Sequence, residues 1–239
     1  MAGGYYIALS GMRARLEALD RLSTDLANAS TVGYKAERGT TAEAGRANFT
    51  DALQSAIDVA NGPNRTDFHT GEIATTGREL DAAIDGPGMF AVKTPSGTRY
   101  TRSGKFLRGN DGTLTTATGM PLEGIDGQPI KVGPGNVEFS GDGTVKNEGE
   151  VVGRLKVVEF PHPALVRRLG TDLFYSDEAP LPATSSAVRA GALEQSNVSV
   201  VERMSELTSV ARSFGTMERA LSTLANDIDS KAITELGRH

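Results

Sequence analysis

The apolar positions near the start of the chain follow the spacing of a helix. A large apolar residue recurs every three or four positions, at Leu9, Met12, Leu16, Leu19 and Leu26, with Ser23 in one apolar slot. This spacing places the side chains on one face of a helix. Gly33 follows as a stop signal. The pattern predicts an amphipathic helix of about 20 residues, roughly 30 Å long.

The last forty residues carry a stronger repeat, with a period of seven. One line of the repeat is Val200, Leu207, Phe214, Leu221 and Ile228, and the second line is Val210, Met217 and Leu224. Two apolar lines sustained over about four heptads are typical of a coiled coil. Ser196 and Asn197 stand where the N-cap of this helix is expected. We expect the two ends of the chain to pair with each other and to leave a stripe for neighbouring copies.

The middle of the chain has a different texture. From residue 81 to 176, short alternating runs are broken by glycines, and Asp-Gly pairs at 85–86, 111–112, 126–127 and 142–143 predict hairpin turns. Strands are expected at 90–92, 154–160 and 173–175. Strands at this spacing favour a sandwich or barrel-like domain. The polar stretch 36–75 is predicted to be an extended connector with a short helix at 49–59.

The predicted fold class is therefore a mainly β central domain with a discontinuous α-helical coiled-coil domain formed by both termini. The expected domains are a terminal helical domain at 1–33 and 193–239, a connector at 34–75 and a β-rich domain at 76–192. The chain enters and leaves the β-rich domain through the same helical base.

Composition narrows the possible functions of the 239-residue chain. The formal net charge is −5, which argues against nucleic acid as the main partner, because phosphate binding requires a basic surface. The absence of cysteine excludes disulfides, cysteine-ligated zinc and thiol catalysis. No apolar stretch approaches 18 residues, so we expect no direct membrane insertion. Charges interrupt the first thirty residues, so no cleaved apolar signal peptide is expected.

A search for catalytic and binding motifs gives no positive result. His69, His162 and His239 do not have metal-ligand spacing. The Gly104-Lys105 pair fails the phosphate-loop pattern in spacing and in the missing hydroxyl residue. We therefore expect no catalytic residue, no metal, no cofactor and no enzyme activity.

Four segments resemble the family of flagellar basal-body rod and hook proteins. The segment 25–35 (Asp-Leu-Ala-Asn-Ala-Ser-Thr-Val-Gly-Tyr-Lys) is similar to the N-terminal signature of that family, the segments 76–90 and 100–106 to its central motif, and the segment 191–198 to the start of its C-terminal helix. The residues that carry the resemblance are Asn28, Gly33, Tyr34, Gly77, Leu80, Asp81, Gly86, Gly88, Phe90, Tyr100, Arg102, Gly104, Phe106, Leu193, Glu194, Ser196, Asn197 and Val198.

Departures from the family pattern are few. Thr24-Asp25 replaces an Asn pair, Tyr34 replaces Phe, and Met89 replaces an aromatic residue. Phe214-Gly215 stands in place of a Tyr-Glu step in the C-terminal helix, where Gly215 suggests a bend or a close contact with a neighbour. Length and the stretch 94–102 favour a proximal rod member, with a distal rod member as the nearest alternative.

The resemblance implies a structural subunit of the periplasmic rod of the flagellar basal body. Such a subunit is exported through the flagellar type III apparatus without cleavage, and it polymerises through its terminal helices with other rod subunits and with copies of itself to transmit torque. The apolar residues of the two helices would then form the assembly interface. The alternative from another class is a soluble coiled-coil adaptor with a β ligand-binding domain.

Overall fold

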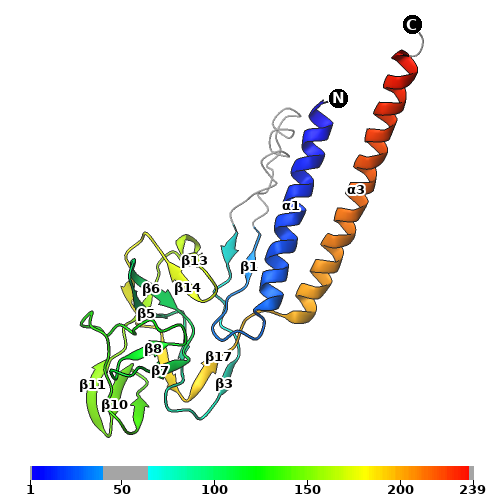
Figure 1. Cartoon of the computed structure of the whole chain (residues 1–239). Helices are drawn as coiled ribbons and strands as arrows, with labels where there is room; N and C mark the ends of the chain where they lie inside the picture. The colour runs from blue at the N-terminus through cyan, green and yellow to red at the C-terminus, as the bar shows by residue number, and fades with distance from the viewer. Residues whose placement is uncertain (1, 40–63, 237–239) are drawn as a thin grey trace. The chain divides into compact units, whose positions relative to one another are not determined.

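A computed structural model describes residues 2–39 and 64–236, with side chains from 11 to 39, from 64 to 219, and at 222 and 223. It has one long helix at each end and short strands between them (Figure 1). The prediction of a mainly β middle with a helix at each end is confirmed. The short helix expected at 49–59 lies outside the described residues.

The two helices are α1, Ala2–Ala27, and α3, Val200–Leu236, which has 37 residues. α1 ends six residues before Gly33, because a turn in which Thr31 N donates to Asn28 O intervenes. α3 runs through Gly215 without interruption, and a Cβ at Gly215 would meet no atom within 4 Å. The close contact of Gly215 with a neighbour stays a prediction.

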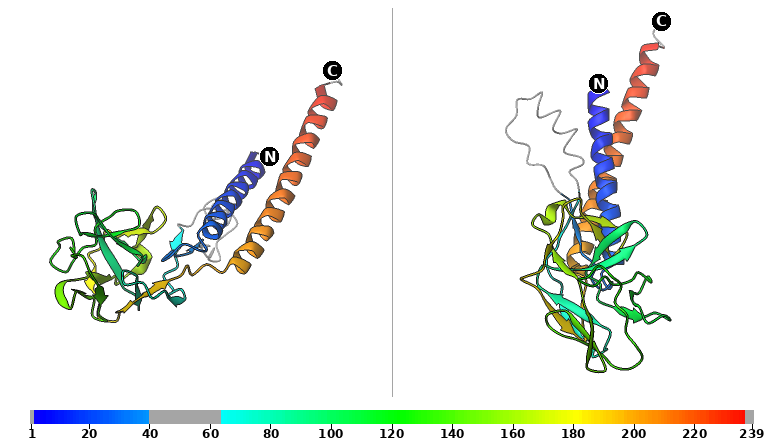
Figure 2. Two further views of the ribbon diagram at one scale, coloured as in Figure 1. Left: turned by 60° about the horizontal axis from the view of Figure 1, so that its bottom comes forward. Right: turned by 90° about the vertical axis from the view of Figure 1, so that its left-hand side faces the viewer.

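The chain forms two compact units. The helical unit contains α1 and α3, within residues 1–26, 38–64 and 199–239, and the β unit comprises residues 27–37 and 65–198. Within the helical unit, α1 and α3 lie side by side and run in opposite directions, as the views in Figures 1 and 2 agree.

The largest sheet of the β unit has six strands. Their order is β13 (Arg167–Leu169), β14 (Leu173–Tyr175), β6 (Gly97–Thr101), β5 (Met89–Thr94), β12 (Val157–Glu159) and β15 (Leu181–Pro182). Neighbouring strands are antiparallel, and Phe90 stands opposite Thr101 in the central pair.

Smaller sheets complete the unit. A three-stranded sheet has the order β11 (Glu150–Arg154), β10 (Thr144–Asn147) and β9 (Val137–Phe139). The two-stranded sheets pair β1 (Glu37–Arg38) with β2 (Arg65–Thr66), β16 (Ala187–Ala190) with β4 (Ala82–Asp85), β17 (Ala192–Glu194) with β3 (Ile73–Thr75), and β7 (Phe106–Arg108) with β8 (Leu114–Thr116). A single 3₁₀ turn, η2, occupies Pro163–Leu165.

Asp-Gly pairs make tight turns where the sequence predicts them. The pair at 111–112 joins β7 to β8, and the pair at 142–143 joins β9 to β10. In both turns the Asp carboxylate accepts a hydrogen bond from the backbone two residues later, at 3.1 Å from Thr113 N and 3.0 Å from Thr144 N. These hydrogen bonds hold the pKa of Asp111 and Asp142 below the ordinary value.

The expected strand at 154–160 is divided in the structure. β11 ends at Arg154 and β12 begins at Val157, and the two strands belong to different sheets. Leu155 between them is buried in the larger core cluster, which also contains Phe90 and Phe106. The chain thus changes sheets at a buried residue, which a continuous apolar run does not reveal.

Candidate functional site

Three of the resemblance segments meet at a buried carboxylate in the β unit. Glu194 accepts a hydrogen bond from Lys35 Nζ at 2.5 Å and from Arg102 Nη1 at 3.2 Å, and the side chains of all three residues are fully buried. The backbone nitrogen of Gly71 donates to the same carboxylate at 2.9 Å. Segments that are far apart in sequence are therefore joined at one point.

The two cations are only partly compensated by this carboxylate. Burial lowers the pKa of both Lys35 and Arg102, and the negative charge of Glu194 partly offsets the effect. Backbone carbonyls accept further hydrogen bonds from the two cations: Lys35 Nζ donates to His69 O at 2.6 Å, and Arg102 Nη2 donates to Gly86 O at 2.7 Å. Removing one partner of such a buried ion cluster lowers the stability of the fold strongly, because the other charge stays buried without a partner.

Asn197 forms a second connection beside this cluster. Its Oδ1 accepts a hydrogen bond from Ala36 N at 2.7 Å, and its Nδ2 donates to Asp67 O at 2.8 Å and to His69 O at 3.1 Å. We call Lys35, Arg102, Glu194 and Asn197 the junction. The junction ties residues 34–37, which follow α1, to residues 194–198, which precede α3.

This use of Asn197 corrects the expected N-cap of α3. The helix begins at Val200, and Ser199 Oγ accepts from Glu202 N at 3.4 Å, which is the geometry of an N-cap. Ser196 Oγ accepts from Val198 N instead. Residues 196–199 include three whose side chains can cap a helix, and only the tertiary contacts decide which one does so.

Gly33 is required where the N-terminal segment crosses the central motif. Its φ is +70°, and a Cβ at this position would collide with the backbone of Arg102 and Ser103. Its nitrogen donates to Glu194 O at 2.8 Å. Tyr34 beside it is fully buried, and the guanidinium of Arg168 stacks 4.3 Å from the centre of its ring.

The remaining resemblance residues support the β unit around the junction. Asp81 is buried and accepts from Thr76 Oγ1 at 2.7 Å, while Gly77 N donates to Gly191 O at 3.0 Å. The others are Asn28 in the turn after α1, Leu80 and Phe106 joined by a backbone hydrogen bond, Gly86 and Gly88 near Ser186, Phe90 and Tyr100 in buried clusters, Gly104 against Ala82, and Leu193 and Val198, both buried.

Sequence reasoning missed Lys35 and the backbone groups that bind to the junction. Lys35 belongs to the N-terminal segment of the resemblance. A buried lysine needs a counter-ion, so its place beside Tyr34 could have predicted an ion pair. Gly71 and His69 contribute through backbone atoms, and their residue types carry no corresponding signal.

In the helical unit, α1 and α3 come together at three places. Asp25 Oδ2 lies 3.3 Å from Arg203 Nε, and Arg15 Nε donates to Ser213 Oγ at 2.7 Å. Further along, a Cβ at Gly11 would lie 3.4 Å from Met217 Cε, so the side chain of Met217 reaches α1 there.

The predicted seam residues divide into three groups. Met12, Leu19, Leu26, Leu207, Val210, Phe214 and Met217 are half-buried. Leu16 and Val200 are exposed at 50% and 40%, so they do not belong to the buried stripe. The structure does not describe the side chains of Leu9, Leu221, Leu224 and Ile228. Leu22, which the predicted seam omits, is the most buried apolar residue among the described side chains of α1, at 2% exposure.

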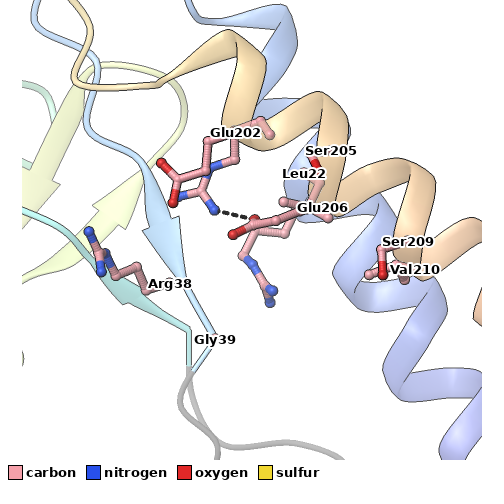
Figure 3. A pocket seen from close by; sticks show the side chains of 10 residues that line it. Leu22, Arg38, Gly39, Glu202, Ser205, Glu206, Ser209 and Val210 are labelled. Carbon is pink, nitrogen blue, oxygen red and sulfur yellow. Dashed lines mark hydrogen bonds and ion pairs between the residues drawn. The ribbon is translucent and has the colours of Figure 1, made fainter.

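A polar hollow of about 590 Å³ lies at the start of α3 (Figure 3). Its wall includes Arg21, Leu22, Arg38, Glu202, Arg203 and Ser205. Arg203 Nη1 donates to Glu206 Oε2 at 2.7 Å, and Arg21 Nη1 donates to Asn64 Oδ1 at 3.1 Å. Arg203 is thus paired with Glu206 and Arg21 with Asn64. Among the described residues of the lining, none is a histidine that could activate Ser205.

The described part of the chain contains no group of metal ligands and no helix that could span a membrane. Among residues 2–39 and 64–236, no three His, Asp or Glu side chains are grouped as metal ligands would be. Within the same residues, neither helix combines the length and the apolar character that spanning a bilayer requires.

Comparison with known proteins assigns the family. Residues 83–152 match the model of the flagellar hook protein FlgE/F/G D1 domain, and residues 189–234 match that of the flagellar basal body rod FlgEFG protein C-terminal region. Flagellar basal-body rod protein FlgF of Caulobacter vibrioides is 30% identical, with 100% of this chain and 99% of the relative covered. FlgF of Rhizobium meliloti is also 30% identical, over 99% of both chains. FlgG of Bacillus subtilis is 29% identical, with 93% of this chain and 95% of the relative covered. The chain therefore belongs to the flagellar basal-body rod protein family and is most like its FlgF members.

Proposed function

We propose that this chain is a non-enzymatic structural subunit of the flagellar basal-body rod, polymerising through its terminal helices to transmit torque. The observation that carries the proposal is the half-buried stripe of the helical unit. Leu207, Val210 and Phe214 remain half-buried after α1 and α3 have paired. Apolar area that one copy leaves exposed favours association at about 25 cal/mol per Å².

The proposal extends to the arrangement of the chain. The pairing of α1 with α3 would be a coiled coil, and the terminal domain would comprise 1–33 and 193–239, with a connector at 34–75 and a β-rich domain at 76–192. The seam of heptads and the antiparallel contacts from Asp25–Arg203 to Gly11–Met217 support this proposal.

The partners follow from the family. We infer assembly with other rod subunits and with copies of this chain in the periplasmic rod, after export through the flagellar type III apparatus without a cleaved signal peptide. FlgF-named relatives favour the proximal rod. The FlgG relative of Bacillus subtilis, at 29% identity, keeps the distal rod as the second candidate position.

Electron microscopy of basal bodies from a strain that lacks the gene tests the function. We expect an absent or truncated rod and non-motile cells, and the length of the remaining stub distinguishes proximal from distal position. Complete basal bodies and normal motility would contradict the proposal.

A paired substitution tests the role of the seam. Phe214→Asp and Leu207→Asp should each prevent rod completion, because a buried charge is placed in the seam. Thr216→Asp adds the same charge at an exposed position of α3 and serves as the control. Purified Phe214→Asp should keep the wild-type urea unfolding of the β unit, whose core does not include residue 214.

A further inference from the structure

The β unit has an apolar hollow of about 370 Å³ beside the hairpin of β10 and β11. Its wall contains Ile125, Val151 and Val152, which are 64%, 60% and 38% exposed, and the buried Ile130. Large apolar side chains that gather at one exposed place mark a surface that binds another protein. We call this surface the apolar hollow, and all of its residues belong to the β unit.

A β-bulge explains why two consecutive valines line the apolar hollow. The pairing of β10 with β11 advances by one residue on β10, from Val145 to Lys146, and by two residues on β11, so Val152 is the extra residue. Consecutive side chains of a regular strand point to opposite faces, and a bulge redirects one of them. β11 is also the edge of its sheet. Because a short, bulged edge is a poor template for strand addition, the hollow suits the side chains of a partner and not a β-strand.

A second exposed apolar surface lies at the 3₁₀ turn η2. The turn contains Pro163, Ala164 and Leu165, which are all exposed, and we call these three residues the apolar turn. Phe160 before it and Val166 after it are buried in the smaller core cluster, and Val166 N donates to Pro163 O at 3.1 Å. Because both ends are anchored and Pro163 has a fixed φ, the apolar turn loses little conformational freedom on binding.

The two surfaces do not meet within one copy. β13 begins two residues after the apolar turn, and Figure 1 shows β13 and β11 at different ends of the β unit. The apolar hollow of one copy can therefore receive the apolar turn of another copy only. Since the two surfaces differ, a contact between them is heterologous and repeats from copy to copy.

Two opposite charges line the apolar hollow. Asp126 lies in a turn and Arg154 at the end of β11, and both are exposed. Arg154 Nε donates to Asp142 O at 2.8 Å, which holds the guanidinium at the rim, and the carboxylate of Asp142 adds a second acidic group. Glu150 and Lys146 stand farther along the hairpin and offset each other in net charge. The hollow thus presents both an acidic and a basic group to a partner.

The apolar turn is flanked by the same two kinds of charge. Arg167 is exposed two residues after the turn. Asp177 is exposed as well, and its neighbour Glu178 lies 2.9 Å from His162, the residue before the turn. Arg168 is paired with a glutamate of β1. In the described part of the chain, Arg167 and Asp177 have no ion-pair partner, so each is available to an opposite charge on a second copy.

We propose that the apolar turn of one copy docks into the apolar hollow of a second copy. In this contact Arg167 lies beside Asp126. Asp177, on the other side of the turn, lies beside Arg154. The inference rests on the proposed function and goes beyond it, because it adds a contact between β units to the assembly through the terminal helices.

The contact acts only inside the assembly. A three-residue turn buries far less than the roughly 800 Å² per partner of a stable interface, so we expect no dimer of the isolated chain through this contact. Once other contacts hold neighbouring copies together, the effective concentration of the two surfaces is high and the contact forms.

Disulfide cross-linking tests the contact, because the chain has no cysteine of its own. The variant Val151→Cys/Leu165→Cys carries one thiol in the apolar hollow and one on the apolar turn. Basal bodies from cells whose only copy is this variant are oxidised, and the products are separated on a non-reducing gel. We expect a ladder of multimers of this chain. Each single variant should stay monomeric, because a hollow meets a turn and not another hollow.

Val151→Cys/Leu181→Cys is the matched control. Leu181 is 55% exposed and Leu165 is 57% exposed, so the two thiols are similarly accessible. Leu181 lies in β15, at the opposite edge of the six-stranded sheet from β13. We expect about tenfold less ladder from the control, because the local thiol concentration is lower away from the contact.

Charge reversal is the second measurement. Arg167→Glu, added to Val151→Cys/Leu165→Cys, should reduce the ladder about fivefold, because Asp126 then faces a like charge. Asp126→Arg, added in turn, should restore the ladder, because both charges of the pair are then reversed. Both positions are exposed, so we expect the β unit to keep its wild-type urea unfolding.

Several results would overturn the contact and leave the rod function standing. They are equal ladders from the two double cysteine variants, no ladder in rods that contain the chain, a cross-linked product with a different protein, or a ladder that Arg167→Glu does not change. If the rods lack the cysteine variant, motility decides: wild-type motility of Arg167→Glu alone overturns the contact, and a loss that Asp126→Arg restores supports it. Complete rods in cells without the gene would overturn the rod function and this contact with it.

Discussion

The junction and the helix pair bury their groups to different extents, and the difference separates folding from assembly. In the junction, the side chains of Lys35, Arg102 and Glu194 are fully buried and hydrogen-bonded within one chain. In the helical unit, Leu207 and Phe214 remain half-buried after α1 and α3 pair. The charges of the junction are thus paired within one chain, whereas apolar side chains of the helical unit stay partly exposed.

This contrast predicts different protection from hydrogen exchange. In the monomer, we expect the amides of residues 5–28 and 200–228 to exchange faster than those around Glu194 and Phe90, because apolar burial is smaller in the helical unit. Strong protection of both helices in the monomer would mean that the helical unit is complete by itself.

The largest expected effect of a substitution is at the junction. Glu194→Gln leaves Lys35 and Arg102 buried without a counter-charge, so we expect a loss of about 3–5 kcal/mol of unfolding free energy. Urea unfolding followed by tyrosine fluorescence measures it. Asp85→Asn is the control, since Asp85 pairs with Arg189 at the surface and its loss should cost under about 1 kcal/mol. Equal effects of the two variants would refute the role of the junction.

The next effect comes from Gly33. Gly33→Ala and Gly170→Ala place a Cβ at nearly the same φ, +70° and +71°. At Gly170 the new atom meets nothing within 4 Å, so only the backbone strain of about 1–2 kcal/mol remains. At Gly33 the Cβ also collides with Arg102 and Ser103, so we expect a clearly larger loss in the same unfolding experiment. A similar loss of unfolding free energy at both sites would show that the backbone around Gly33 moves apart without a loss of stability.

A smaller effect is expected within the helical unit. Asp25→Asn removes the carboxylate that contacts Arg203 and should cost the helix pair about 1–3 kcal/mol. Hydrogen exchange of residues 12–26 and 203–217 should become faster, while exchange around Glu194 stays unchanged. A change spread equally over both units would contradict their independence.

The smallest effect should be stabilising. Gly215→Ala adds a methyl group where no atom lies within 4 Å, so α3 should gain about 1 kcal/mol of helix propensity. Circular dichroism of the monomer at rising temperature measures the gain. Alanine at this position should disturb rod assembly only where a neighbouring copy packs closely against residue 215, so motility assays with the same variant locate that contact.

The sequence by itself determined the elements and much of the family signature. Heptad spacing identified α3, the three-to-four spacing identified α1, and Asp-Gly pairs identified hairpins, because these signals are local. The same locality explains what the pattern leaves open. Leu22 was missed, and Val200 is exposed within one copy, because burial depends on where the partner helix lies.

Only the tertiary structure decided how the segments of the signature act together. Lys35, Arg102 and Glu194 are separated by more than sixty residues at each step, and no periodicity links them. Their convergence depends on sheet pairing, such as β17 with β3, which brings Glu194 opposite Ile73. Likewise, the length by which α3 exceeds its partner follows from the register set by Asp25, Arg15 and Gly11. A register is a relation between two helices, and neither sequence segment contains it alone.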